Sequence, residues 1–230
     1  MTYKISEALT PTPSAPPASP AAEERLAAIR AFVRRRLKKK ARRRHGKSAA
    51  ADLRWQHSLR VSRYGQIIAE AEGADVHLTT VTCLLHDIAR FDPGATQDHG
   101  RLGAQIARKR LHRWGYAPHE IEAISYAIAV HVDEPQPKTL LAQILADADD
   151  IDRFGPYRTL TRWGRRALDD YAAAIEAARA HLQMCRSYQQ TPTMHTPTGQ
   201  QLFDAQVAWR IDFFTALIAE HQAIHTPGAS

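Results

Sequence analysis

Apolar residues recur every three or four positions through most of the chain after residue 50, which is the spacing of an amphipathic helix. No stretch alternates strictly between apolar and polar residues for long enough to predict a strand. With its glycine and proline breaks, the pattern predicts successive helices over residues 53–71, 76–90, 100–114, 118–131, 139–153, 168–186 and 201–221. We therefore expect an all-α fold.

One of these predicted helices contains an anomaly. The segment from Val81 to Arg90 is apolar on almost all sides, which predicts a buried helix. His86 and Asp87 nevertheless stand side by side in its middle. A buried ionisable group is costly unless it is paired or binds a metal, so other parts of the chain must compensate these two side chains.

The apolar periodicity of three other helices predicts such partners. Together with Asp87, these helices give four predicted helices that each place one polar residue on the buried face, and these residues are His57, Asp87, His131 and Asp147. His86 lies about 100° round the helix from Asp87, and His99 lies at or just before a helix start. One buried histidine is more often a satisfied core residue, but the combination favours a metal site between helices. Imidazole and carboxylate ligands suit Mn, Fe, Co, Ni or Zn.

The charge of the chain is concentrated at its N-terminal end. The net charge is +7, but residues 1–48 hold thirteen Lys/Arg against three Glu, so this segment carries +10 and the remainder carries −3. Residues 10–20 are rich in proline and are predicted to be disordered. Nine of the eleven residues from Arg34 to Arg44 are basic. Such a basic segment is typical of a solvated helix, of a weak contact with the backbone of a nucleic acid, or of a contact with an anionic surface. It lacks aromatic residues, which argues against base-specific recognition.

Other features of the sequence indicate the cellular compartment. No apolar run approaches the roughly 20 residues that a membrane-spanning helix needs, and the N-terminus lacks the charged and then apolar order of a secretory signal. The two cysteines, Cys83 and Cys185, make no disulfide framework. We expect a reducing, cytoplasmic compartment.

The order and context of the inward polar residues resemble the H…HD…D pattern of HD-domain metal-dependent phosphohydrolases. The matching residues are His57, His86 with Asp87, and Asp147. Residues 84–88 resemble the core helix of the family and residues 144–152 resemble its last ligand motif. Residues 196–202 are similar to the C-terminal part of a bacterial subgroup of single-domain HD phosphohydrolases. The resemblance covers about residues 50–222, which leaves 1–48 as a Pro-rich and basic extension and 223–230 as a tail.

The resemblance implies an HD-domain helical bundle with a metal site in its core, holding one or two divalent ions. His99 and His131 match an extended pattern, H…HD…H…H…D. In that pattern one metal is held by His57, His86, Asp87 and Asp147. The second is held by His99, His131 and the bridging Asp87, which thereby also becomes a catalytic residue. Asp150, one turn beyond Asp147, is a candidate for orienting a metal-bound water. Candidates for binding an anionic substrate are Arg60, Arg90 and Arg153.

The function implied is hydrolysis of a phosphoester or phosphoanhydride, in a nucleotide or another small phosphorylated molecule, through a metal-activated water. A mixed-valent di-iron oxygenase uses a similar ligand set and is the first alternative. The second alternative is a nucleic-acid-binding protein that uses the basic N-terminal segment.

Overall fold

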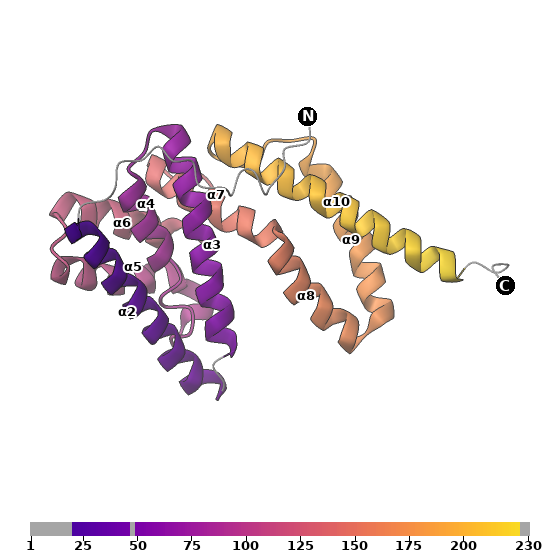
Figure 1. The fold of residues 1–230 in the computed structure, drawn as a ribbon, viewed down its shortest axis with the longest axis horizontal. Helices are drawn as coiled ribbons and strands as arrows, with labels where there is room; N and C mark the ends of the chain where they lie inside the picture. The colour runs from indigo at the N-terminus through magenta and orange to yellow at the C-terminus, as the bar shows by residue number, and fades with distance from the viewer. Residues whose placement is uncertain (1–19, 47–48, 226–230) are drawn as a thin grey trace. The chain divides into compact units, whose positions relative to one another are not determined.

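The computed structural model describes residues 20–46 and 49–225. Residues 10–19 of the Pro-rich segment, predicted to be disordered, lie outside the described residues, as does the end of the expected C-terminal tail, residues 226–230. Within the described ranges the chain is helical and has no strand, which confirms the all-α prediction (Figure 1). None of the described helices is long and apolar enough to cross a membrane.

The helices follow one another with short connections. Their bounds are α2 Pro20–His45, α3 Ala49–Glu72, α4 Val76–Leu85, α5 Ala95–Arg113, α6 Pro118–Val130, α7 Leu140–Phe154, α8 Pro156–Asp169, α9 Tyr171–Tyr188 and α10 Pro197–His225. The chain divides into two compact units within α7, between Asp149 and Asp150. We call them the N-terminal unit and the C-terminal unit.

The core of the N-terminal unit is built from five helices, α2 to α6. Its fully buried side chains include Leu37, Leu84, Leu111, Ile124 and Ile128, each at most 1% exposed. Close approach of α5 to α6 depends on Gly100, where a Cβ atom would lie 2.8 Å from the backbone oxygen of Ala129. Only glycine fits there without moving one helix, which places the beginning of α5 directly against the end of α6.

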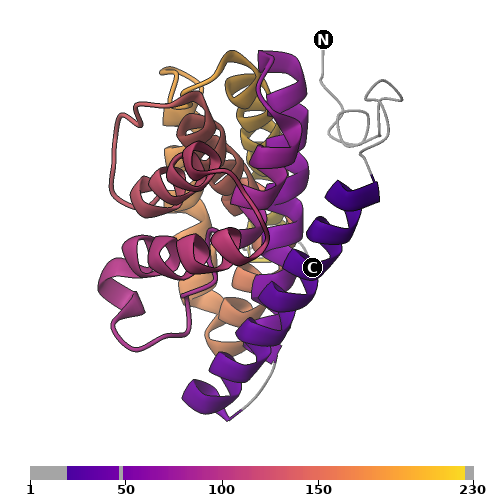
Figure 2. The ribbon, with the colours of Figure 1, turned by 90° about the vertical axis from the view of Figure 1, so that its left-hand side faces the viewer.

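Helix α2 is part of this core, although the sequence analysis assigned residues 1–48 to an extension of the domain. Its apolar side chains at Ile29, Phe32, Val33, Leu37 and Ala41 are at most 7% exposed and belong to the same hydrophobic cluster as α4, α5 and α6. The helix lies alongside α3 in both views of the ribbon (Figures 1 and 2). The hydrophobic core of the N-terminal unit therefore begins near residue 29 and not near residue 50.

The segment that carries His86 and Asp87 differs from the predicted continuous helix. Helix α4 ends at Leu85, and His86 and Asp87 follow in a series of turns. Backbone hydrogen bonds there join residues three apart, such as Arg90 N to Asp87 O at 3.0 Å. Such turns point consecutive side chains about 120° apart, yet Nε2 of His86 and Oδ2 of Asp87 lie 3.4 Å from each other, so both side chains reach one site. Burial was predicted correctly, since His86 is 0% and Asp87 is 3% exposed.

The C-terminal unit contains the end of α7 together with α8, α9 and α10. Its core side chains are Trp163, Ala178, Leu182, Phe214 and Ile218. Helix α8 was not predicted from the sequence; its interior holds Gly164 and its apolar residue Leu168 is 90% exposed. The next helix begins later than the predicted residue 168, because Asp170 caps α9 by accepting a hydrogen bond from Ala173 N at 2.9 Å.

A buried arginine joins the helices of this unit. Arg210 is 4% exposed and lies over the ring of Phe154, 4.5 Å from its centroid. It donates hydrogen bonds to Arg153 O at 2.9 Å, Thr159 Oγ1 at 3.0 Å and His181 Nε2 at 2.8 Å. Burial lowers the pKa of His181 to about 4, and the positive charge of Arg210 lowers it further in the same direction. His181 is therefore neutral at neutral pH, as an acceptor from arginine must be.

Candidate metal centre

Five segments of the N-terminal unit bring histidine and aspartate side chains together. His57 comes from the middle of α3, and His86 and Asp87 follow the end of α4. His99 lies at the start of α5, just after Asp98 interrupts the helical backbone. Two further segments contribute His131, at the end of α6, and Asp149, in α7. Asp98 also caps the following turn, because its carboxylate accepts a hydrogen bond from Arg101 N at 3.1 Å.

These side chains form three overlapping groups in which the potential ligand atoms lie within 4.8 Å of one another. The groups are His57, His86 and Asp87; His86, His131 and Asp149; and Asp87, His99 and His131. An imidazole nitrogen or a carboxylate oxygen from each member is a suitable ligand for a divalent transition metal. The residues are thus positioned to hold a metal, which is the chemistry predicted from the sequence.

The two oxygens of Asp87 face different histidines. Oδ2 lies 3.5 Å from Nε2 of His57 and 3.4 Å from Nε2 of His86, whereas Oδ1 lies 3.4 Å from Nε2 of His99. The His131 ring lies between the two sides, with its centroid 5.2 Å from the ring of His86 and 5.2 Å from that of His99. A carboxylate placed in this way can offer one oxygen to each of two ions.

Backbone carbonyl groups fix two of the imidazole rings. His86 Nδ1 donates to Cys83 O at 2.6 Å, and His131 Nδ1 donates to Ile128 O at 2.7 Å. Because a carbonyl oxygen can only accept, each Nδ1 carries the proton and each Nε2 keeps its lone pair for a metal. Burial lowers the pKa of His131 to about 4, with a further contribution from His86, so this ring is neutral at neutral pH.

Asp87 is ionised despite its burial. Burial by itself raises the pKa of this carboxyl group, but the positive charge of Arg54 and the neighbouring histidines His86 and His57 hold the pKa well below 3.8. Arg54 forms a short ion pair with Oδ2 of Asp87. Arg54 was not among the arginines predicted from the sequence to bind substrate, which were Arg60, Arg90 and Arg153. The available signal was that Arg54 precedes His57 by three residues and so lies on the same helix face.

Arg90, predicted to bind substrate, contacts a candidate ligand. Its guanidinium donates to Nδ1 of His99 at 3.1 Å, so Nδ1 has no proton and Nε2 of His99 carries it toward Asp87. An ion that binds Nε2 of His99 must displace this proton, and Arg90 must then give up its hydrogen bond to Nδ1. Arg90 therefore contacts Asp87 indirectly, through the His99 ring, whose Nε2 lies 3.4 Å from Oδ1 of Asp87.

The last aspartate of the site is not the one that the sequence analysis named. Asp149 Oδ1 lies 3.2 Å from Nε2 of His57 and 4.0 Å from Nε2 of His86, whereas Asp147 belongs to none of the three groups. The two aspartates are two residues apart, about 200° round α7, so they face opposite sides of the helix. Both are buried, at 4% and 1% exposure, because α7 is enclosed on more than one side. Its apolar stripe therefore did not identify the face that carries the site.

The remaining predicted residues lie outside the three groups. Arg60 is on α3, one turn after His57, and is partly buried. Asp150 and Arg153 belong to the C-terminal unit, where they pair with each other at 2.9 Å and are 45% and 53% exposed. Their proposed roles in orienting water and binding substrate remain predictions.

A family model matches the part of the chain that carries these side chains. Residues 54–153 match the model of the HD domain. The chain contains an HD domain. The matched segment includes all members of the three groups, from His57 on α3 to Asp149 on α7. HD domains bind divalent metals, so the matched family and the observed geometry indicate the same chemistry.

Curated relatives match about half of the chain. Ribonuclease Y of Chloroflexus aurantiacus is 34% identical over 123 residues, which are 53% of this chain and 22% of the relative. Ribonuclease Y of Nitratidesulfovibrio vulgaris is 36% identical over 102 residues, which are 44% of this chain and 18% of the relative. The chain thus spans about a fifth of the length of these relatives.

Solved structures share the fold over most of the chain. A protein described as a predicted HD superfamily hydrolase, from an uncultured Thermotogales bacterium, has a TM-score of 0.60 at 23% identity, covering 85% of this chain and 92% of that one. Bacillus subtilis YpgQ, solved in complex with ADP, has a TM-score of 0.59 at 21% identity, covering 91% and 98%. These likenesses show the HD fold, and the HD domain itself supports a hydrolase of the phosphohydrolase type.

Proposed function

We propose that this protein is a metal-dependent phosphohydrolase that cleaves a phosphoester or phosphoanhydride bond in a nucleotide. The observation that carries the proposal is the pair of ligand groups that share Asp87. Two ions held on either side of this carboxylate would suit phosphoryl transfer, because a pair of close metal ions can hold a nucleophile and a phosphate in line.

We propose His57, His86, Asp87 and Asp149 as ligands of one ion, and Asp87, His99 and His131 as ligands of the other. Asp149 takes the place that the sequence motif gave to Asp147. Bound metal supplies a water whose pKa is lowered to about 7 and neutralises charge on the phosphate oxygens. The carbonyl groups of Cys83 and Ile128 keep His86 and His131 in the tautomer that binds through Nε2.

Cationic side chains beside the ligands are suited to hold the substrate. Arg54 and Arg90 contact Asp87 and His99, so each lies next to a candidate metal position and can bind a phosphate oxygen that the metals also contact. Arg60 and Arg153 are further candidates for this role, and Asp150 is a candidate for orienting the attacking water. The proposed substrate class is supported by the relatives, since one is named as a ribonuclease and another structure contains ADP.

Both cysteines are free and buried, which supports the proposed reducing, cytoplasmic compartment. A di-iron oxygenase remains the competing function, because it would use the same histidines and carboxylates.

The experiment is a phosphate-release screen. Purified protein is stripped with chelator, reloaded separately with Mn, Co, Ni or Mg, and incubated with nucleoside mono-, di- and triphosphates and with short RNA. We expect release of phosphate or nucleotide with at least one metal, and its loss in His86→Ala. His119, exposed on α6, provides the matched control, since His119→Ala leaves the site intact. Absence of hydrolysis with every metal, accompanied by oxygen consumption in the iron-loaded protein, would establish the oxygenase instead.

A further inference from the structure

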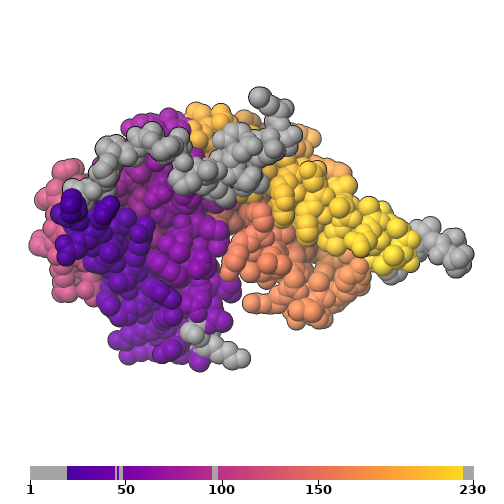
Figure 3. Space-filling model, in the orientation of Figure 1, coloured from indigo at the N-terminus to yellow at the C-terminus, as the bar shows by residue number. Residues whose placement is uncertain are grey.

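The solvent-facing side of α2 carries an uninterrupted cationic surface. We call it the α2 basic face, and it consists of Arg34, Arg35, Lys38, Lys39 and Arg42. These side chains, with Ala31, line a shallow groove of about 600 Å³. At 100° per residue they fall within an arc of about 140°, on the opposite side of the helix from the buried apolar residues. The space-filling view shows α2 at the surface of the molecule (Figure 3).

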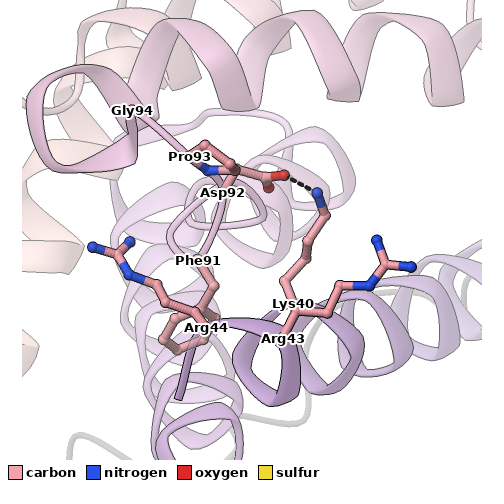
Figure 4. A pocket seen from close by; sticks show the side chains of 7 residues that line it. All are labelled: Lys40, Arg43, Arg44, Phe91, Asp92, Pro93 and Gly94. Carbon is pink, nitrogen blue, oxygen red and sulfur yellow. Dashed lines mark ion pairs between the residues drawn. The ribbon is translucent and has the colours of Figure 1, made fainter. Parts of the chain in front are cut away.

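This surface is held rigidly by contacts on the other sides of α2. Arg36 Nε donates to Ile88 O at 3.0 Å, and its terminal nitrogen pairs with the Asp92 carboxylate at 2.6 Å. Lys40 forms a second ion pair with Asp92, which is 6% exposed (Figure 4). Together with the buried apolar side, these contacts make α2 a fixed element and not a loosely attached solubility tail. Its charges are therefore presented at defined positions.

Little negative charge offsets the α2 basic face. No acidic residue occurs between Arg34 and Arg44. Lys38 lies 3.6 Å from Asp52, and this exposed pair contributes little neutralisation in water. Within residues 20–46 and 49–225, Arg34, Arg35 and Arg42 make no ion pair. Like charges at helical neighbour positions repel one another, so this arrangement weakens the isolated helix and is relieved by binding a polyanion.

The geometry excludes insertion of α2 into a bilayer and favours a nucleic acid as the polyanion. A helix that binds a bilayer surface places its apolar side among the lipid chains. In α2 that side is buried in the protein core, at Ile29, Phe32, Val33, Leu37 and Ala41, and cannot reach lipid. The cationic side chains extend about 12 Å along the helix, from Arg34 to Arg42, which suits a row of successive phosphates. The α2 basic face has no aromatic side chain for base stacking.

We propose that the α2 basic face binds the sugar–phosphate backbone of a nucleic-acid strand without sequence preference. This binding is separate from the hydrolysis proposed for the metal centre, since none of the candidate metal ligands lies on α2. About five phosphates are contacted, so the logarithm of the binding constant falls against the logarithm of salt concentration with a slope of about −3.5 for a single strand.

The test measures binding of fluorescent single-stranded RNA and DNA of mixed sequence by anisotropy, at several salt concentrations, using the full chain. Chelator is present throughout, so that hydrolysis at the metal centre does not affect the reading. The variant carries Arg34→Gln, Arg35→Gln, Lys39→Gln and Arg42→Gln, which removes four charges and keeps good helix formers. The control removes four exposed charges elsewhere, with Lys109→Gln, Arg113→Gln, Arg165→Gln and Arg186→Gln. Alanine at the same four α2 positions provides a second, independent variant.

We expect both α2 variants to bind at least tenfold more weakly than the wild type at low salt, with a slope reduced to about −0.7, while the control stays close to the wild type. RNA and DNA should bind alike. Equal weakening in the variant and the control would show a response to net charge alone and overturn the proposal. Binding to vesicles of equimolar phosphatidylserine and phosphatidylcholine that equals binding to RNA and depends on the same residues would assign the surface to membranes instead.

Discussion

The choice between the two aspartates of α7 gives the sharpest test of the site. Asp149 belongs to a group with His86 and His131 and also lies 3.2 Å from His57, whereas Asp147 belongs to no such group. Asp149→Asn should therefore remove a metal ligand, and Asp147→Asn should not. The two substitutions are matched, because both replace a buried carboxylate on the same helix with an amide of the same size.

The magnitude follows from the number of ligands that the ion loses. Removing a group that merely supports a ligand weakens metal binding about 10–100-fold, so loss of Asp149 itself should weaken it at least about 100-fold. A metal at 100 times its dissociation constant stabilises the wild type by about 2.7 kcal/mol, and after a 100-fold loss the same concentration gives about 0.4 kcal/mol. For a chain of this length, the rise in melting temperature on adding metal should fall from roughly 5–10 °C to about 1–2 °C.

The assay is thermal unfolding with and without Mn or Co for each variant. Taking the difference on adding metal separates binding from stability, because Asp147→Asn also removes a buried charge and should lower the stability of the metal-free protein by about 1–3 kcal/mol. Asp147→Asn should keep the full metal-dependent shift. If Asp149→Asn kept the shift and Asp147→Asn lost it, the assignment of ligands from the structure would be refuted.

Three further results are expected. Gly100→Ala should destabilise the protein and lower its metal content, because the added Cβ atom forces α5 away from α6 and so separates His99 from His131. The control Gly164→Ala, which has open space around it, should leave stability unchanged or raise it slightly. Differential scanning calorimetry and metal analysis of both variants measure these effects. Leu37→Ala should lower the free energy of unfolding, measured with denaturant, by about 2–5 kcal/mol, because α2 belongs to the core. The exposed control Leu168→Ala should change it by no more than about 0.5 kcal/mol. An equally small change for Leu37→Ala would contradict a core position for α2. NMR titration should give His181 a pKa of about 4 in the folded protein. Unfolding restores the ordinary pKa near 6.5, so between these two pH values the unfolded chain binds more protons than the folded chain. The free energy of unfolding should therefore fall as the pH is lowered from about 6.5 to about 4.

The helical spacing of apolar residues was sufficient to find the fold class and most of the candidate ligands. His57 and His131 each continue an apolar stripe, so the spacing that predicts burial also predicts which way they point. His86 and Asp87 stood out because they are charged or polar in a segment that is otherwise apolar. These signals are local, and a single helix is enough to show them.

The features that were missed depend on contacts between helices. Asp149 could not be distinguished from Asp147 because α7 is buried on several sides, and the choice depends on where His57 lies. Arg54 becomes part of the site through Asp87, which is 33 residues later in the chain. The apolar residues of α2 alternate with many basic ones, and nothing in its own sequence shows that α4, α5 and α6 offer a surface to cover them.

The central claim is that this HD domain holds a metal and uses it for hydrolysis, and one measurement on one sample tests it most directly. The metal content of the purified chain is determined by mass spectrometry alongside its phosphate-releasing activity, before chelation, after chelation and after metal is returned. We predict one or two transition-metal ions per chain, loss of activity in step with loss of metal, and recovery of both. Full activity in the metal-free chain, or a chain that takes up no metal when it is offered, would contradict the account.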